Sequence, residues 1–376
     1  MLVGVPKEIK NHEYRVGLTP AAVKEFVAHG HQVMVETNAG TAIGFTDELY
    51  QNAGAMIVDS AEQIFAEAEM IVKVKEPQPS ECKQLRKGQT LYTYLHLAPD
   101  PVQTELLIAS GATCIAYETV TDRNGGLPLL APMSEVAGRM SVQAGAHYLE
   151  KAHGGSGTLL GGVPGVAPGK VLVIGGGVVG TNAAKMALGL GADVTILDRS
   201  LPRLRQIDDI FNGQVKTVYS TVDAIEHYSS KADLVVGAVL IPGAAAPKLL
   251  TREQIKAMKP GSVLVDVAID QGGCFETSKA TTHQDPVYVV DDVVHYCVAN
   301  MPGGVARTST MALNNATLPF GLALANKGPK AAMLEDQHLL NGLNVHKGKV
   351  TYKAVVDALG EELNLEYMEA TAALEL

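Results

Sequence analysis

A glycine-rich motif in the middle of the chain constrains the fold more than any other feature. Residues 175–180 (GGGVVG) fit the pattern G-x-G-x-x-G and directly follow an apolar run, 171–174, typical of a buried strand. The next segment, 178–190, has helical spacing, and Asp198 ends the following predicted strand. This is the pattern of a dinucleotide-binding motif: a strand, a glycine turn, a helix and an acid roughly 20 residues further on. In such a motif the pyrophosphate binds at the helix N-terminus.

Each residue type in the motif has a physical reason. Gly175 permits the tight turn, Gly177 lets the backbone approach the pyrophosphate, and Gly180 lets helix and strand pack closely. Asp198 can hydrogen-bond the ribose hydroxyls and repel a 2′-phosphate, which favours NAD over NADP, although Arg199 directly follows it. The competing interpretation is a glycine-rich turn of another α/β protein, and the agreement of strand, helix and acid favours the dinucleotide.

Strands alternate with helices on both sides of a central boundary. That boundary is a long predicted helix, 134–152, followed by a glycine-rich loop, 154–169. The alternation predicts an α/β fold of two Rossmann-like, doubly wound domains. One domain comprises residues 129–306 and the other combines 1–128 with 307–376, because the C-terminal tail is too short to fold alone. The predicted strands are 2–5, 32–36, 70–74, 90–95, 113–117, 171–174, 193–197, 215–219, 234–239, 263–267 and 287–290.

Composition excludes several classes of protein. The net charge of −10 argues against nucleic acid or an anionic membrane surface as a partner. The most apolar stretch, 232–247, contains Asp233 and two prolines and is too short to cross a bilayer. Four scattered cysteines, with no C-x-x-C pair, suit a reducing cytoplasm better than a disulfide frame or a zinc site. We therefore expect a cytoplasmic protein that acts on small molecules, with no nucleic-acid or membrane partner.

Three polar side chains follow predicted strands of the first domain. Arg15 follows 2–5, Lys75 follows 70–74 and His96 follows 90–95. Arginine binds a carboxylate bidentately, lysine polarises a carbonyl oxygen, and histidine exchanges a proton near neutral pH. Each residue alone has an ordinary structural explanation. Their combination with a dinucleotide domain favours a crevice in which a small acid loses hydride.

Segments after later strands of the second domain belong to the same sheet edge. They are 239–240, 267–270 and 298–301, and ligands of open α/β sheets bind at that edge. Asp270 could face the cofactor there. It could equally initiate a turn, since Gly272 and Gly273 follow it, and position alone leaves both interpretations open.

Motifs in both domains resemble those of the alanine dehydrogenase family, over nearly the whole chain. That family also contains the soluble subunit of nicotinamide nucleotide transhydrogenase and saccharopine-type dehydrogenases. The motifs that carry the resemblance are 4–10 (GVPKEIK), 13–16 (EYRV), 74–77 (VKEP), 94–98 (YLHLA), 132–138 (PMSEVAG), 175–180 and 295–303 (HYCVANMPG).

The resemblance implies a role for individual residues. Arg15, Lys75 and Asn300 match substrate-binding positions, with Arg15 on the carboxylate, and His96 and Asp270 match the catalytic pair. Lys279 matches a cofactor position where close relatives are expected to carry arginine. The other positions that match NAD contacts are Ser134, Gly175, Gly177, Val178, Val179, Gly180, Asp198, Arg203, Ser220, Val239, Leu240, Val267, Ala268, Ile269, Asp270, Val298, Ala299, Asn300 and Met301.

The resemblance also implies an activity and an assembly. It implies NAD-dependent oxidative deamination of L-alanine to pyruvate and ammonium, in a cleft between the two domains of a homohexamer. No metal is expected, because residues 320–327 lack the glutamate and histidine of a metal site thought to occur in some relatives. Three alternatives stay open: a transhydrogenase subunit that presents NAD(H), an NAD-binding module without turnover, and a dehydrogenase of another small amino acid.

Overall fold

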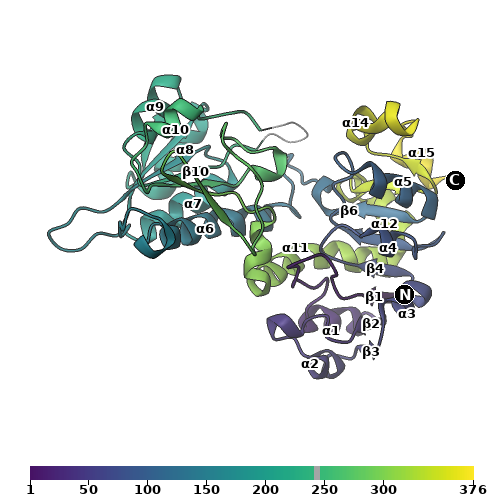
Figure 1. The fold of residues 1–376 in the computed structure, drawn as a ribbon. Helices are drawn as coiled ribbons and strands as arrows, with labels where there is room; N and C mark the ends of the chain where they lie inside the picture. The colour runs from purple at the N-terminus through teal and green to yellow at the C-terminus, as the bar shows by residue number, and fades with distance from the viewer. Residues whose placement is uncertain (241–245) are drawn as a thin grey trace. The chain divides into compact units, whose positions relative to one another are not determined.

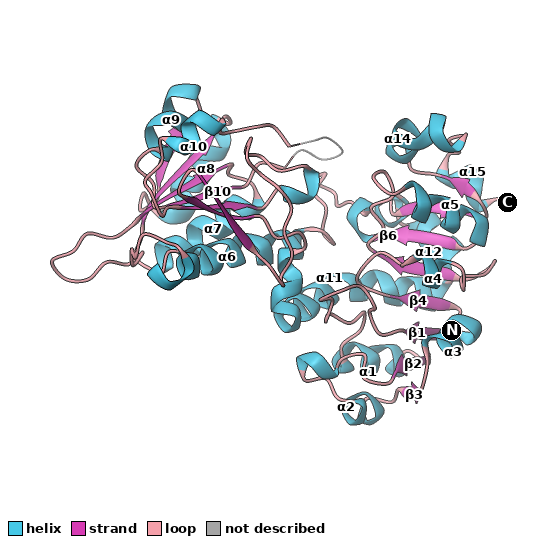
Figure 2. Cartoon of the chain, in the orientation of Figure 1, coloured by secondary structure: helices cyan, strands magenta, loops and turns pink. Residues whose placement is uncertain are grey.

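The chain folds into two compact units, seen in a computed structural model that describes residues 1–240 and 246–376 (Figure 1). The first unit combines Met1–Met133 with Val305–Leu376, and the second is Ser134–Gly304. Each unit is a mainly parallel sheet with helices interleaved along the chain (Figure 2). The prediction of two doubly wound α/β domains is confirmed. Part of the apolar stretch 232–247 lies outside the described residues.

Six parallel strands form the centre of the first unit's sheet. Their spatial order is β3-β2-β1-β4-β5-β6, so the order reverses between β1 and β4 (Figure 1). Two antiparallel strands from the C-terminal segment, β14 and β15, extend the sheet beside β6. The bounds are β1 (Leu2–Val5), β2 (Gln32–Glu36), β3 (Met56–Val58), β4 (Met70–Val72), β5 (Thr90–Thr93), β6 (Thr113–Ala116), β14 (Leu343–His346) and β15 (Lys349–Val350).

Side-chain caps start several helices of the first unit. Thr19, Thr46, Ser60 and Asp100 each accept a backbone N–H in the first turn that follows them, which satisfies one of the helix's unpaired amides. The helices are α1 (Pro20–Ala28), α2 (Asp47–Asn52), α3 (Ala61–Glu67), α4 (Pro79–Cys82), α5 (Pro101–Ser110), α11 (Ala306–Lys327), α12 (Pro329–Glu335), α13 (Gln337–Leu340), α14 (Lys353–Leu363) and α15 (Ala370–Leu374), with short 3₁₀ turns η1 (Thr41–Ile43) and η2 (Tyr117–Thr119).

The second unit repeats the same strand order. Its parallel strands run β9-β8-β7-β10-β11-β13, with β12 antiparallel at the edge, so the order reverses between β7 and β10. The strands are β7 (Lys170–Ile174), β8 (Asp193–Asp198), β9 (Lys216–Tyr219), β10 (Leu234–Gly237), β11 (Val263–Asp266), β12 (Val287–Val290) and β13 (Val293–Tyr296). The helices are α6 (Ala131–Tyr148), α7 (Val178–Gly189), α8 (Leu201–Phe211), α9 (Val222–Ser229) and α10 (Arg252–Lys256), with η3 (Lys151–His153), η4 (Ile269–Gln271) and η5 (Met301–Val305).

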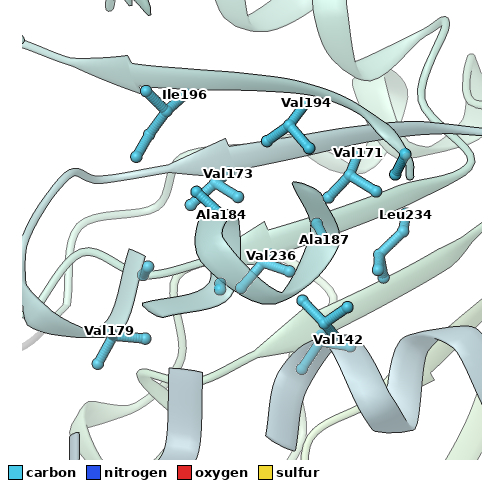
Figure 3. Packing of buried hydrophobic residues seen from close by; sticks show 14 of the residues in the cluster. Val142, Val171, Val173, Val179, Ala184, Ala187, Val194, Ile196, Leu234 and Val236 are labelled. Carbon is cyan, nitrogen blue, oxygen red and sulfur yellow. The ribbon is translucent and has the colours of Figure 1, made fainter. Parts of the chain in front are cut away.

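Small residues let α7 lie close to this sheet (Figure 3). Ala184 and Ala187 of α7 pack with Val171 and Val173 of β7, and Val142 of α6 joins the same buried cluster. Continuous β-branched runs suit strands that are covered on both faces. None of the described helices combines the length and the apolar character needed to cross a membrane.

One strand prediction was wrong in kind. Residues 287–290 were expected to continue the parallel alternation, but they form the antiparallel edge strand β12. The sixth parallel strand is β13, which the sequence analysis missed. Asp291 and Asp292 separate the two, with φ of +49° and +63°. Two left-handed residues make a tight hairpin turn, and an Asp-Asp pair is a weak sequence signal for one because glycine is absent.

Candidate active site

The first unit places its three predicted polar residues after three neighbouring strands. Arg15 follows β1, Lys75 follows β4 and His96 follows β5, and these strands pair in the order β1-β4-β5. Arg15 and Lys75 therefore flank the point where the strand order reverses. The crevice at that point is where open α/β sheets bind ligands.

Arg15 is buried and held rigidly. It is 3% exposed, and its Nε and Nη2 atoms donate to the two carboxylate oxygens of Glu13, each over 2.7 Å. Burial by itself lowers the pKa of Arg15, but the bonds and charge of Glu13 outweigh it and raise that pKa. The guanidinium is thus a permanent, oriented cation, which suits recognition of a carboxylate.

The loop that carries Arg15 is clamped to the sheet. A Cβ on Gly17 would lie 2.4 Å from the carbonyl oxygen of Val72, so only glycine fits against the end of β4. Asn314 of α11 donates to the carbonyl of Gly17 over 3.0 Å and accepts from the backbone N–H of Thr19 over 2.9 Å. These contacts join a loop near the N-terminus to a helix almost 300 residues later.

Lys75 is partly buried at the end of β4. Its Nζ lies 3.3 Å from a carboxylate oxygen of Glu76, and its carbonyl oxygen accepts from the Thr93 hydroxyl over 3.1 Å. Burial alone would raise the pKa of Glu76, but Lys75 and Lys10 outweigh burial and lower it. Glu76 is thus held as a carboxylate beside the ammonium group of Lys75.

A buried cluster of charged side chains holds the backbone at Lys75. The Nζ of Lys73, which is 0% exposed, lies 2.7 Å from Glu8 and 3.0 Å from Glu81. Glu8 also accepts the backbone N–H groups of Val74 (2.7 Å) and Lys75 (3.3 Å). Burial raises the pKa of Glu8 despite the opposing charge of Lys73. For Lys73, burial lowers the pKa, but the two carboxylates prevail and raise it. Sequence reasoning missed this cluster, because nothing local separates it from surface charges.

His96 sits at a strained corner after β5. Its φ is +49°, and its backbone N–H donates to Glu118 over 2.6 Å. The ring stacks on Tyr94, with 5.8 Å between centroids and 8° between planes, and the side chain is 46% exposed. Nδ1 lies 3.9 Å from a carboxylate oxygen of Glu118. Sequence reasoning also missed Glu118, in the η2 turn after β6.

The glycine motif of the second unit has the geometry of a phosphate-binding turn. Gly175 has a φ of +105°, and a Cβ on Gly180 would lie 1.7 Å from the Gly175 carbonyl oxygen. A Cβ on Gly177 would meet nothing within 4 Å, and no side chain caps α7. The start of α7 thus has room beside Gly177 and no capping side chain, which fits an anionic ligand that approaches the backbone.

Two charged side chains, one at the end of β8 and one in α8, hold this turn in place. Asp198 accepts from the backbone N–H groups of Gly176 and Ser200, each over 2.7 Å. Arg203 donates from Nε to the Gly176 carbonyl over 2.6 Å and from Nη2 to the Thr181 hydroxyl over 2.9 Å. Arg203 thus stabilises the glycine turn through hydrogen bonds, and the carboxylate of Asp198 lies beside Gly176.

Most of the other predicted cofactor residues lie along the same carboxyl edge. Val178 and Val179 form the first turn of α7, and buried Ser220 follows β9. Ser134 lies one helical turn before Gly138, where a Cβ would be 2.3 Å from the Val179 carbonyl oxygen, so α6 approaches the start of α7 closely. The remaining segments follow β10 (Val239, Leu240), β11 (Val267, Ala268, Ile269, Asp270) and β13 (Val298, Ala299, Asn300, Met301).

The buried carboxylate of Asp266 holds the loop that carries Asp270. Asp266, at the end of β11, accepts from the backbone N–H groups of Ala268 (3.0 Å) and Cys274 (2.8 Å) and from the Ser278 hydroxyl. Asp270 lies in η4, before two glycines with positive φ, and its side chain is exposed. It therefore belongs to a turn and also offers its carboxylate to solvent or ligand.

Lys279 lies apart from the glycine motif. Its Nζ is 5.1 Å from the ring centroid of Tyr288 in the edge strand β12, and three strands separate β12 from β7. Asn300 has a φ of +63°, and its carbonyl oxygen contacts Nε2 of His283 at 2.9 Å. Asn300 thus occupies a fixed turn after β13, whereas Lys279 stacks on an aromatic ring at the sheet edge.

The buried histidine of β13 should make stability depend on pH. Burial lowers the pKa of His295, so the unfolded chain binds a proton more readily than the folded one. The contribution of neutral His295 to the free energy of unfolding is therefore complete above about pH 6.5. It is lost as the pH falls through the folded pKa. We expect His295→Gln to show a smaller drop in Tm between pH 7.5 and 5.5 than the unsubstituted protein. The exposed His227→Gln serves as control, and an unchanged drop in His295→Gln would contradict the assignment.

Comparison with known families and structures agrees with this arrangement. The model described as "Alanine dehydrogenase/PNT, N-terminal domain" matches residues 4–137, and its C-terminal counterpart matches 141–353. Together these matches span most of the chain.

Individual relatives cover the full length. An alanine dehydrogenase from Halomonas elongata is 63% identical over 374 residues, covering 100% of both chains. A solved L-alanine dehydrogenase superposes with a TM-score of 0.93 at 52% identity, covering 96% of this chain and 99% of the other. A transhydrogenase from Sinorhizobium meliloti gives 0.81 at 26% identity, over 94% of this chain and 100% of the other. The chain belongs to the alanine dehydrogenase/PNT family.

Proposed function

We propose that the chain is an enzyme that catalyses the NAD-dependent oxidative deamination of L-alanine. L-Alanine, NAD⁺ and water give pyruvate, ammonium, NADH and a proton, and the reaction is reversible. The observation that carries the proposal is the 63% identity to an alanine dehydrogenase over the whole length of both chains. In this assignment the second unit binds NAD and the first is the catalytic unit.

The residues of the second unit fit a dinucleotide. The open position at Gly177 and the uncapped start of α7 would receive the pyrophosphate, and Asp198 would bind the ribose hydroxyls. When bound, NAD would supply the acceptor for the hydride that leaves the substrate. The segments after β10, β11 and β13 would line the rest of the dinucleotide site.

Substrate binding falls to the cations of the first unit. Arg15, oriented by Glu13, would bind the carboxylate of L-alanine bidentately. Lys75 would contact the carboxylate or the developing carbonyl oxygen. Because both follow strands at the reversal of strand order, one small acid can contact both.

Proton transfer falls to His96. Loss of hydride from the α-carbon leaves an iminium, water adds to it, and ammonia leaves the carbinolamine. His96 would accept the proton of the attacking water and return one to the departing amine. Glu118 would hold His96 in place by accepting its backbone N–H, and the Asp270 carboxylate would orient the water or the amine.

A direct assay tests the proposal. The purified full-length chain should reduce NAD⁺ with L-alanine, followed by absorbance of NADH, and should run in reverse with pyruvate, ammonium and NADH. Activity only with another small amino acid would overturn the substrate. NADH binding without turnover on any amino acid would instead favour a nucleotide-presenting subunit or a binding module.

Asp198 offers a test of the cofactor assignment. Asp198→Asn removes the charge assigned to the ribose, keeps an acceptor for the Gly176 amide and loses the acceptor for the Ser200 amide. Hydrogen bonds to charged groups contribute about 1.5–3 kcal/mol, so we expect the KM for NAD to rise about 10- to 100-fold, with a smaller change for NADP. Asp209→Asn, on the exposed face of α8, is the matched control. An unchanged NAD to NADP ratio would contradict the role of Asp198.

We further infer a cytoplasmic homohexamer that needs neither nucleic acid nor membrane. This inference rests on the family resemblance and on the acidic net charge of −10. Light scattering coupled to size-exclusion chromatography should give six times the mass of the 39.6 kDa chain.

A further inference from the structure

A cluster of three metal-ligating side chains lies outside the proposed active site. His147 is in the last turn of α6, His153 ends η3, and Glu150 lies between these two elements. One ligand atom from each lies within 4.8 Å of the others, and all three residues are exposed. Among the described residues, this is the one such group of histidine, cysteine or carboxylate side chains.

The distances in the cluster leave room for a small cation. Oε1 of Glu150 lies 3.7 Å from Nδ1 of His147, and Oε2 lies 3.7 Å from Nε2 of His153. Both separations are too long for hydrogen bonds. Ligands of a tetrahedral Zn²⁺ site, with bonds near 2.0–2.1 Å, lie about 3.4 Å apart. All three ligand atoms lie within 4.8 Å of one another, so movements of the exposed side chains by up to about 1.4 Å would complete a three-sided coordination site.

The backbone brings these three residues together. The N–H of Glu150 donates to the carbonyl of His147, and the N–H of His153 donates to the carbonyl of Glu150, each over 3.1 Å. The backbone of Glu150 is extended, with φ of −63° and ψ of 142°, so the chain bends between the end of α6 and η3 and brings the three side chains to one place. A continuous α-helix, at 3.6 residues per turn, would place the third side chain well around the helix from the first.

The neighbouring residues hold this geometry. A Cβ on Gly155 would lie 2.3 Å from the Tyr148 carbonyl oxygen, so the chain folds tightly back on the end of α6. The ring of Tyr148 packs against His147 (5.0 Å between centroids) and His153 (5.7 Å). The centroids of the two imidazole rings lie only 4.0 Å apart.

We propose that His147, Glu150 and His153 bind a divalent late transition-metal ion such as Zn²⁺, with water in the remaining positions. Two imidazole nitrogens and one carboxylate suit this class of ion, whereas Ca²⁺ and Mg²⁺ prefer all-oxygen sites. The bound ion joins the end of α6 to the start of the glycine-rich loop 154–169. The site is independent of the proposed catalytic residues, and its role is structural.

Metal titration of the full-length chain, without a histidine tag and after chelator treatment, tests the site. Calorimetry should give one equivalent of Zn²⁺, and Co²⁺ should give visible d–d absorption. Zn²⁺ should raise Tm, because the ion binds the folded chain. His147→Ala and His153→Ala should each lose the binding and the Tm shift, whereas His227→Ala, a lone exposed histidine, should retain both.

Loss of metal binding in these variants would not be a consequence of unfolding, because all three side chains are exposed and their replacement leaves the core intact. Absence of a one-equivalent site in the unsubstituted chain would overturn the proposal. Binding that survives both His147→Ala and His153→Ala would overturn it equally, since the ion would then sit elsewhere. Deamination of L-alanine, measured alongside, should be unchanged in the variants, so failure of the metal site is distinguishable from failure of the proposed function.

Discussion

Replacement of His96 by asparagine should lower kcat for L-alanine deamination about 10²- to 10⁴-fold, the usual contribution of a general acid or base. Asparagine tolerates the positive φ at this corner better than most residues, and its backbone N–H can still donate to Glu118. Binding of NADH, measured by its fluorescence, should be unchanged because the glycine motif lies in the other unit. The variant thus removes the proton carrier while it preserves the fold and the nucleotide site.

Two further variants make the His96 experiment decisive. His227→Ala, at an exposed histidine of α9, should retain full activity. Glu118→Gln should lower kcat less than His96→Asn, because it leaves the imidazole in place and keeps an acceptor for the His96 amide. A kcat near that of the unsubstituted enzyme in His96→Asn would show that another group moves the proton.

Replacement of Lys73 by methionine should lower the free energy of unfolding by about 3–5 kcal/mol, as expected when one partner of a buried ion pair is removed. Glu8 and Glu81 would be left as buried carboxylates without their shared cation. Because Glu8 also holds the amides of Val74 and Lys75, the KM for L-alanine should rise as well. Urea unfolding measures the first effect and steady-state kinetics the second.

The sign of the pH dependence identifies the cause of that loss. Without Lys73, the pKa of Glu8 in the folded protein is raised further above its unfolded value. The contribution of Glu8 to the free energy of unfolding is therefore favourable at low pH, and it is lost as the pH rises through the folded pKa. The deficit of Lys73→Met should therefore be smaller at pH 5 than at pH 8. The double variant Lys73→Met with Glu8→Gln should recover part of the stability, and the exposed Lys83→Met should lose little. A deficit independent of pH would point to lost packing instead of unpaired charge.

Local sequence signals predicted most strands and the position of the nucleotide motif. β1 and β2 have the predicted bounds, because short apolar runs are readable within a few residues. The hairpin between β12 and β13 was not predicted, since its two left-handed residues are aspartates and not the glycine that usually marks such a turn. The antiparallel edge strand followed from that turn.

The groups that orient the predicted site residues come from distant parts of the chain. Glu118 reaches His96 across 22 residues, and Glu8 reaches Lys73 across 65. No spacing rule connects such positions in one sequence, because the contact depends on which strands become neighbours. Glu13 is the exception, two residues before Arg15, where an acid beside a candidate anion-binding arginine was itself a readable signal.

By itself, the sequence determined the fold class, the glycine turn and the candidate polar residues that end each strand, because these depend on periodicity and conformation within one element. Only the tertiary structure decided the strand order β1-β4-β5, which puts Arg15, Lys75 and His96 on adjacent strands. It also decided that His147, Glu150 and His153 converge, although all three are visible in the sequence. Convergence depends on where a helix ends and how the chain turns, and those are set by packing between elements far apart in the chain.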